Sequence, residues 1–180
     1  MSAGFTEVMV DIETTGLSPD HSAIIQITAI RFSLEPRTID HGWFDQCLRI
    51  PPSRFWDQGT REFWIKHMPV FKAIQARMRD PREVIREFYD WAGGSQCQLH
   101  FWSKPLSFDF PMIQSYFREF ELPMPFDFRK GRDLRTHIAA VAPQFDERSV
   151  PFEGDVHNSL FDTLHQIKML YAAHPSGESE

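Results

Sequence analysis

The chain has 180 residues, of which 42% are hydrophobic and 14% aromatic, and a formal net charge of −6. This length is typical of one domain with one packed core. The sequence contains no run of about 20 apolar residues and no basic leader followed by an apolar segment, so we expect neither a membrane partner nor export. The acidic balance argues against extensive non-specific wrapping of nucleic acid, although a local acidic site would lower the charge without excluding that partner.

The two cysteines, Cys47 and Cys97, form no CxxC pair and no Cys/His cluster at zinc spacing. Neither a disulfide framework nor a thiolate metal site is therefore indicated, and a reducing, cytoplasmic location fits best. Residues 1–173 read as one domain. Residues 174–180 are small and polar, and we expect them to form a flexible tail.

The first third of the chain predicts three strands, Phe5–Glu13, Ile24–Phe32 and Thr38–Ile50. Each carries β-branched or aromatic residues, and Gly, Pro, Asp and Ser turns separate them. Because the three strands follow one another directly, they predict an antiparallel meander.

The middle of the chain changes to a spacing of three to four residues, which predicts short helices around Pro69 and after Pro81. A further strand is expected at 98–103, followed by a helix with Pro111 in its first turn. Asp133 is a candidate cap for a helix that reaches about Ala142. The last helix is expected from about Asn158 to Ala172, with an apolar stripe of Leu160, Leu164, Ile167 and Tyr171. This alternation predicts an α/β fold, a mixed β-sheet flanked by helices.

Asp11 and Glu13 end the first apolar strand. Since strand side chains alternate, the i, i+2 spacing places both carboxylates on one face, roughly 6 to 7 Å apart. Water at an exposed sheet edge is the commoner explanation of an isolated pair of this kind. Val8, Met9 and Val10 make the approach apolar, however, and a buried pair is costly unless protons or a cation neutralise it. Mg²⁺ or Mn²⁺ would suit such oxygen ligands, and further carboxylates should then converge on the pair.

Asp109 lies where a strand is expected to give way to a helix, and Asp162 lies inside the last helix, away from its core stripe. Helix capping explains the first residue equally simply, and solvent exposure the second. His157 precedes Asp162 by five residues, which on a continuous helix would separate them by about 140°. If Asn158 opens the helix, the His157 ring is free to approach Asp162 and to accept a proton from a metal-bound water near neutral pH. A solvated loop histidine is the alternative.

Three segments resemble, in order and spacing, the three motifs of the DEDD family of 3′-5′ exonucleases, histidine subtype (DEDDh): Asp11–Leu17, Ser107–Asp109 and His157–Asp162. That family includes oligoribonuclease, ribonuclease T and polymerase proofreading subunits. Two further segments, Thr60–Trp64 and Arg132–Thr136, look like the ribonuclease-T-like exoribonuclease group of mycobacteria and bacteriophages. The chain departs from that group at Ser103–Leu106, where a Gly/Asn-rich turn is common, so the local substrate contacts there do not carry over.

The resemblance implies a ribonuclease-H-like fold, in which the antiparallel meander of three strands is joined by parallel strands, and a single exonuclease domain over residues 1–173. It implies hydrolysis of single-stranded nucleic acid, RNA or single-stranded DNA with RNA favoured, from the 3′ end with two divalent metal ions, Mg²⁺ or Mn²⁺. Asp11, Glu13 and Asp162 would surround the metal that holds the attacking water, and Asp11 with Asp109 the second. His157 would be the general base. Two cations about 3.5 to 4 Å apart stabilise both the attacking and the leaving oxygen at phosphorus.

The same resemblance suggests substrate contacts. The Thr14 backbone and the Leu17 side chain would engage the terminal 3′-OH and base, although Leu17 serves equally well as a cover for its turn. Trp64 and Phe108 are candidates for base stacking, with core packing favoured for Trp64.

Arg132 and Arg135, with Arg129 and Lys130, form the densest basic cluster and are candidate phosphate contacts. A second cluster has the spacing of solvated helix faces: Arg77, Arg79, Arg82 and Arg86.

Two other function classes stay open: a catalytically silent nucleic-acid-binding or adaptor protein on this fold, and a metal-dependent nucleotide phosphoesterase. A silent adaptor is expected to have lost a carboxylate or the histidine, and none of the five is missing. The resemblance is also compatible with a homodimer.

Overall fold

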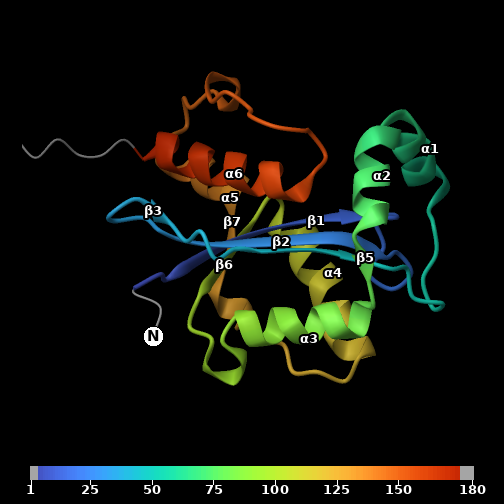
Figure 1. The fold of residues 1–180 in the computed structure, drawn as a ribbon. Coiled ribbons are helices and arrows are strands. Elements are labelled where there is room, and N and C mark those ends of the chain that lie inside the picture. The colour runs from blue at the N-terminus through green and yellow to red at the C-terminus, as the bar shows by residue number, and fades with distance from the viewer. Residues whose placement is uncertain (1–3, 175–180) are drawn as a thin grey trace, which may run out of the picture.

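A β-sheet between two layers of helices forms the body of the protein, and a helical hairpin lies across one end of the sheet (Figure 1). The structure is a computed structural model that describes residues 4–174, so the predicted tail lies outside the described residues except for His174. The strands are β1 (Glu7–Thr14), β2 (Ile24–Ser33), β3 (Thr38–Ile39), β4 (Phe44–Leu48), β5 (Met78–Arg79), β6 (His100–Ser103) and β7 (Gly131–Asp133). The helices are α1 (Gln58–Lys66), α2 (Met68–Ala76), α3 (Pro81–Trp91), α4 (Leu106–Glu119), α5 (Leu134–Val141) and α6 (Ser159–Ala173), with three short 3₁₀ turns.

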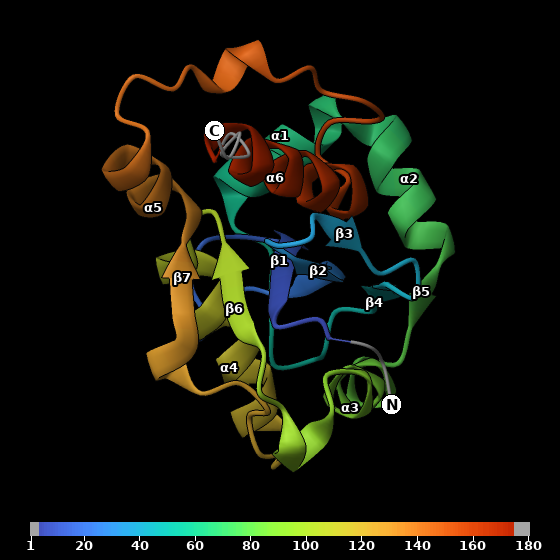
Figure 2. The same ribbon diagram turned by 90° about the vertical axis from the view of Figure 1, so that its left-hand side faces the viewer.

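The sheet is mixed, in the order β5-β4-β2-β1-β6-β7, and β3 also pairs with β2. Strands β1, β2 and β4 are antiparallel neighbours, whereas β6 is parallel to β1 and β7 is parallel to β6. Figure 2 shows β7 and α5 at one edge of the sheet and β5 and α2 at the other. The predicted combination of an antiparallel part with parallel strands is therefore confirmed.

Both faces of the sheet are apolar, because β1 and β2 are buried by helices on each side. One face packs against α3 and α4, and it takes Val8, Val10 and Ile12 from β1. The other packs against α5 and α6 and takes Met9. Alternation along β1 therefore turns its odd-numbered side chains toward α6. No helix in the described part of the chain is long and apolar enough to cross a membrane.

The predicted third strand is split into β3 and β4 by a turn at residues 40–43. The Asp40 carboxylate accepts the Gly42 backbone amide at 2.9 Å, and this local bond interrupts the ladder. The prediction of one continuous strand was wrong for this reason.

Helix α4 begins earlier than predicted, at Leu106, so Pro111 is its sixth residue and not part of its first turn. Pro105 is extended and precedes the helix, and the Leu106 backbone amide donates to the Asp133 carboxylate at 2.8 Å. The other oxygen of Asp133 caps α5 as predicted, by accepting the Thr136 backbone amide at 2.8 Å. A cap supplied by a residue 27 positions away was invisible to local sequence rules.

Candidate active site

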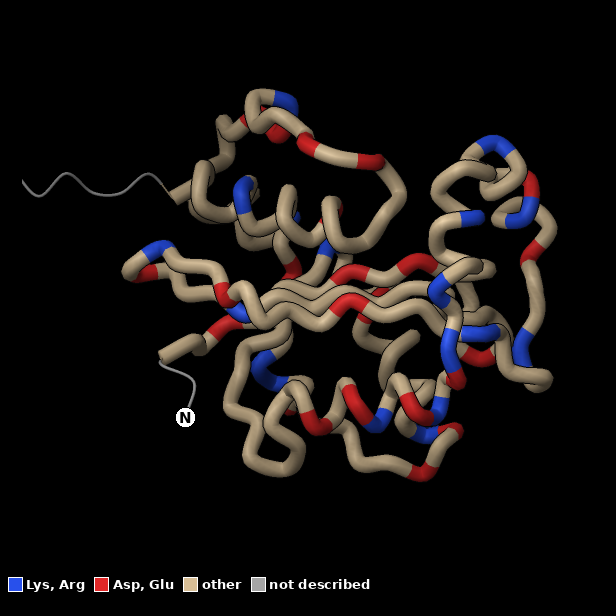
Figure 3. Tube along the Cα trace, in the orientation of Figure 1, with Lys and Arg blue, Asp and Glu red and all other residues tan. Residues whose placement is uncertain are grey.

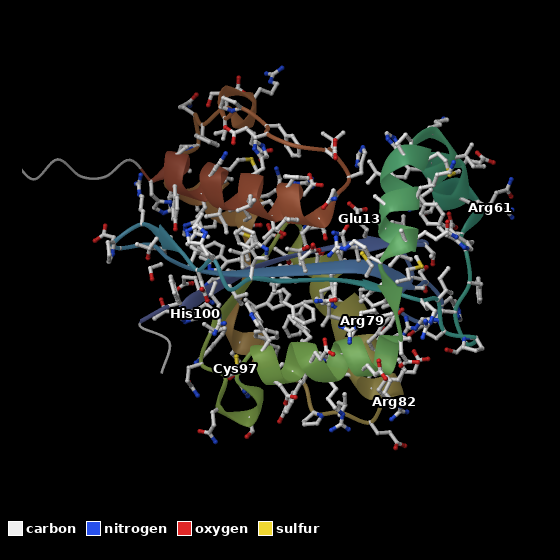
Figure 4. All side chains as sticks on the ribbon, in the orientation of Figure 1. Glu13, Arg61, Arg79, Arg82, Cys97 and His100 are labelled. Carbon is white, nitrogen blue, oxygen red and sulfur yellow. The ribbon has the colours of Figure 1, made fainter. Side chains whose placement is uncertain are left out.

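Three acidic side chains meet where β1 ends beneath the first turn of α6. Asp11 and Glu13 come from the α6-facing side of β1, and Asp162 comes from the first turn of α6. One carboxylate oxygen from each lies within 4.8 Å of the others. Glu13 lies between the start of α6 and the α1–α2 hairpin (Figure 4). The predicted convergence of carboxylates on the Asp11–Glu13 pair is thus present in the fold.

Asp109 reaches the same region from the first turns of α4, where its side chain is 2% exposed. It has room there because β1 pairs with β6 only from Glu7 to Met9, so the flank of β1 that faces away from β2 is open from Val10 to Thr14. Burial raises the pKa of Asp109 to about 8, against the opposing effect of the nearby Ile12 backbone amide. The open flank of β1 therefore admits a fourth acid.

The four carboxylates oppose one another's ionisation. Burial, followed by the charges of Asp109, Glu13 and Asp162, raises the pKa of Asp11 well above its ordinary range. Burial and the neighbouring Asp162 and Asp109 charges do the same to the pKa of Glu13. Burial raises the pKa of Asp162 to about 6. Oxygen ligands that cannot all ionise without a counter-charge fit a hard divalent cation.

Gln166 fixes the orientation of Asp11. Its amide nitrogen donates to the Asp11 carboxylate at 2.7 Å. Its amide oxygen is buried and has no hydrogen-bond partner among the described residues, so it is available to a group that enters the site. The sequence analysis did not single out Gln166, although its position four residues after Asp162 places both side chains on one face of α6.

His157 stands just before α6, whose cap is Asn158, as the sequence analysis required. Its backbone has a positive φ of 64°, and its backbone amide lies near enough to Asp162 to oppose the rise that burial causes in the pKa of that carboxyl. Its ring lies 4.7 Å from the Phe63 ring and 4.4 Å from the His67 ring, both contributed by the α1–α2 hairpin. Burial, assisted by His67, lowers the pKa of His157, so the ring is neutral at pH 7 and able to accept a proton. The sequence analysis did not identify Phe63 or His67 as neighbours of this ring.

A hollow of about 430 Å³ lies beside the carboxylates. It is lined by Ile12, Glu13, Thr14, Leu17, Asp57, Gly59, Thr60, Phe63, Trp64 and Phe108. Four of the six candidate substrate contacts are thus together in one place: Thr14, Leu17, Trp64 and Phe108.

These four side chains differ in what they offer to a ligand. Leu17 is 76% exposed and lines the hollow. Trp64 is 2% exposed, and its indole nitrogen donates to the Thr14 carbonyl at 2.9 Å, so it is packed as a core residue whose edge reaches the hollow. Phe108 is half-buried in the first turn of α4.

The candidate phosphate contacts Arg132 and Arg135 do not line this hollow. Arg132 lies on β7, and its guanidinium donates to the Gly131 carbonyl at 3.1 Å. Arg135 is exposed on α5. In Figure 2, β7 and α5 lie at the edge of the sheet opposite α2, and neither arginine is among the residues that line the hollow.

Comparisons with known proteins agree with this arrangement. The model of the Rv2179c-like 3′-5′ exoribonuclease domain family matches residues 6–173. A search of curated proteins gave no match.

Solved structures of nucleases share the fold. A structure of exonuclease I superposes with a TM-score of 0.73 at 13% identity, over 93% of this chain and 40% of that one. Exonuclease I of E. coli in complex with an oligonucleotide gives 0.69 at 14% identity, over 93% and 40%. Cell-death related nuclease 4 (CRN-4) gives 0.67 at 15% identity, over 93% and 63%. The chain therefore spans about two fifths of exonuclease I, and the predicted ribonuclease-H-like α/β fold is confirmed.

Proposed function

The chain belongs to the Rv2179c-like 3′-5′ exoribonuclease domain family, and from that premise we propose that it removes nucleotides singly from the 3′ end of single-stranded nucleic acid, RNA in preference to DNA. The observation that carries the proposal is the meeting of Asp11, Glu13 and Asp162 within 4.8 Å, with Asp109 beside them. The preference for RNA is supported by the description of the matching family. The exonuclease domain would span residues 1–173.

The donor set suits divalent cations, Mg²⁺ or Mn²⁺. Asp11, Glu13 and Asp162 would hold one ion, and Asp11 with Asp109 a second. When bound, such ions supply a polarised water and charge compensation for the phosphate.

The remaining side chains of the site would orient the substrate and move the proton. The neutral His157 ring would accept a proton from the attacking water, and its backbone amide near the Asp162 carboxylate would keep it beside the acids. The hollow would receive the terminal nucleotide, with its base against the exposed Leu17 side chain and Phe108. Gln166 would hold Asp11 in its ligating orientation.

The proposal is tested with 5′-labelled single-stranded RNA and DNA of one sequence, incubated with Mg²⁺ or Mn²⁺. Wild-type protein should produce a ladder of products shortened by single nucleotides, and RNA should be shortened faster. Asp11→Ala should produce none. Asp90→Ala, an exposed acid on α3, is the matched control and should behave as wild type.

Other results would identify another function. Binding of the oligonucleotide without shortening under either metal would indicate an adaptor. Hydrolysis of mononucleotides in place of the polymer would indicate a nucleotide phosphoesterase.

A further inference from the structure

The α1–α2 hairpin carries a second hollow, of about 460 Å³, which the proposed chemistry does not use. It is lined by Trp56, Arg61, Trp64, Ile65, Met68, Phe71 and Gln75, and we call it the hairpin groove. Its lining is mostly apolar or aromatic, and Ile65 is 60% exposed. Because this exposed side chain lies in one hollow with four other apolar or aromatic side chains, the group forms a contiguous apolar surface of the kind that meets a ligand.

The hairpin groove lies across α1 from the hollow beside the carboxylates, which we call the catalytic hollow. Helical spacing turns Thr60 and Phe63 toward the catalytic hollow. The same spacing turns Arg61 and Ile65 toward the groove. Trp64 lines both, so one buried indole forms the ridge between them. A chain that leaves the catalytic hollow over this ridge enters the groove.

Aromatic rings continue without a break from the groove to the candidate general base. Ring centroids are 5.6 Å apart between Trp56 and Phe71 and 5.7 Å apart between Phe71 and Trp64. The run continues from Trp64 to Phe63 at 5.4 Å and from Phe63 to His157 at 4.7 Å. Trp64 in this run is 2% exposed and packs as a core residue, so the run holds the groove beside the catalytic site, and only its partly exposed rings such as Phe71 are open to the bases of a single strand.

The charge of the hairpin differs in sign from that of the whole chain. Residues 58–76 hold three Lys or Arg and one acid, in a protein of net charge −6 (Figure 3). Arg61, Lys66 and Lys72 are exposed and make no ion pair with any described residue. Arg61 lies on the outer side of α1, away from Glu13 (Figure 4). Arg61 lines the groove, and Lys72 lies one helical turn from both Met68 and Gln75, which also line it. Unpaired cations placed in this way complement a polyanion with flat apolar bases.

We propose that the hairpin groove binds the nucleotides that precede the 3′-terminal one in a single-stranded substrate. Their bases lie against Ile65, Met68 and Phe71, and their phosphates meet Arg61 and Lys72. This inference rests on the proposed exonuclease function, because it extends the path of the same strand beyond the catalytic hollow. It predicts that the enzyme prefers oligonucleotides over dinucleotides.

The test compares an octanucleotide with a dinucleotide of the same 3′ end, both 5′-labelled. Their KM values are measured with Mg²⁺, and their Kd values by fluorescence anisotropy in EDTA, where no turnover occurs. Ile65→Asp should lower the octamer-over-dinucleotide preference about tenfold, because a carboxylate in the groove repels phosphate and base. Val141→Asp, an equally drastic change at an exposed apolar residue of α5, should keep the preference.

A second variant, Arg61→Ala with Lys72→Ala, leaves the apolar lining intact. It should weaken binding of the octanucleotide. It should also reduce the steepness of the plot of log binding constant against log salt concentration by about 1.4, the value expected for two phosphate contacts on a single strand. Arg148→Ala, a highly exposed cation on a 3₁₀ turn, is the control. If Ile65→Asp does not fold, the Arg61→Ala, Lys72→Ala double variant alone tests whether the hairpin groove binds the strand.

Two results would overturn the inference. The first is an unchanged length preference in both groove variants with wild-type melting temperatures. The second is a change from dimer to monomer in Ile65→Asp by sedimentation, which would make the groove a contact between copies of the chain. Loss of the exonuclease function itself would appear separately, as absence of turnover in wild type with length-dependent binding still measurable.

Discussion

Carboxylates toward the two ends of β1 have opposite surroundings. Glu7 is buried at the start of the strand and accepts bonds from the Trp102 indole nitrogen at 2.6 Å and the Thr6 hydroxyl at 2.9 Å, with His100 Nδ1 at 3.0 Å. Asp11, on the same face, accepts one bond from Gln166 and faces three other acids. A buried carboxylate whose neighbours supply its hydrogen bonds has a structural role. A carboxylate placed among other acids is typical of a site that binds a cation.

Isosteric substitutions at the two ends should separate these roles, and this is the largest effect we expect. Glu13→Gln should lower the exonuclease rate by about 10³, because it removes a ligand charge at the reacting centre, and should leave the free energy of unfolding unchanged or higher without metal. Glu7→Gln should lower that free energy by about 1 to 3 kcal/mol, because its new NH₂ group opposes existing donors. The exonuclease rate and the free energy of unfolding in urea are measured for both variants. Equal losses of activity in the two folded variants would contradict the assignment of a catalytic role to Glu13 and a structural role to Glu7.

His157→Ala should reduce kcat by about 10² while metal binding is kept, because the ring is a candidate base and not a ligand. Calorimetric titration with Mn²⁺ measures the affinity. Metal loss as large as in Asp11→Ala would show instead that His157 supports the metal site. His41→Ala, an exposed histidine between β3 and β4, is the matched control.

The stability of the metal-free protein should fall as pH rises. The pKa of Asp162 is raised from 3.8 to about 6 and that of Asp109 from 3.8 to about 8. A raised folded-state pKa means that the folded protein binds these protons more tightly, so the stabilisation is complete below pH 4 and lost as pH passes 6 and then 8. We expect a melting temperature roughly 5 °C lower at pH 8 than at pH 5 in EDTA, and closure of that gap by Mg²⁺.

Asp109→Asn provides the control for this prediction. It should remove the part of the fall between pH 6 and pH 8, since Asn does not titrate. A pH profile that is the same in the variant and wild type would place the titration elsewhere.

Gln166→Leu should weaken Mn²⁺ binding about tenfold, because the side chain that orients Asp11 is lost while its volume is retained. The melting temperature without metal should change little, since Asp11 is the only described hydrogen-bond partner of this side chain. An unchanged Mn²⁺ affinity would reduce Gln166 to a packing residue. This is the smallest of the expected effects, and it tests whether the site is held from α6 as well as from β1.

Much of the candidate site was predictable because it depends on local rules. Strand alternation places Asp11 and Glu13 on one face, and the Asn158 cap leaves His157 outside the helix. Rules of this kind failed where a partner is distant in sequence, as at the start of α4, which Asp133 caps from 27 positions away. The break in the third predicted strand is a different case, because the bond between Asp40 and Gly42 is local and the strand-forming residues around it outweighed the turn signal.

The sequence by itself determined the residue types of the site, the α/β class, and the caps and strand faces, since each depends on atoms a few residues apart. Only the tertiary structure decided that Asp109 enters the flank of β1 left open by β6, that Gln166 holds Asp11, and that Arg132 and Arg135 lie away from the hollow. It also placed the α1–α2 hairpin beside His157. The physical reason is that the packing of a helix on a sheet depends on the sum of many non-local contacts, which local periodicity and capping do not encode.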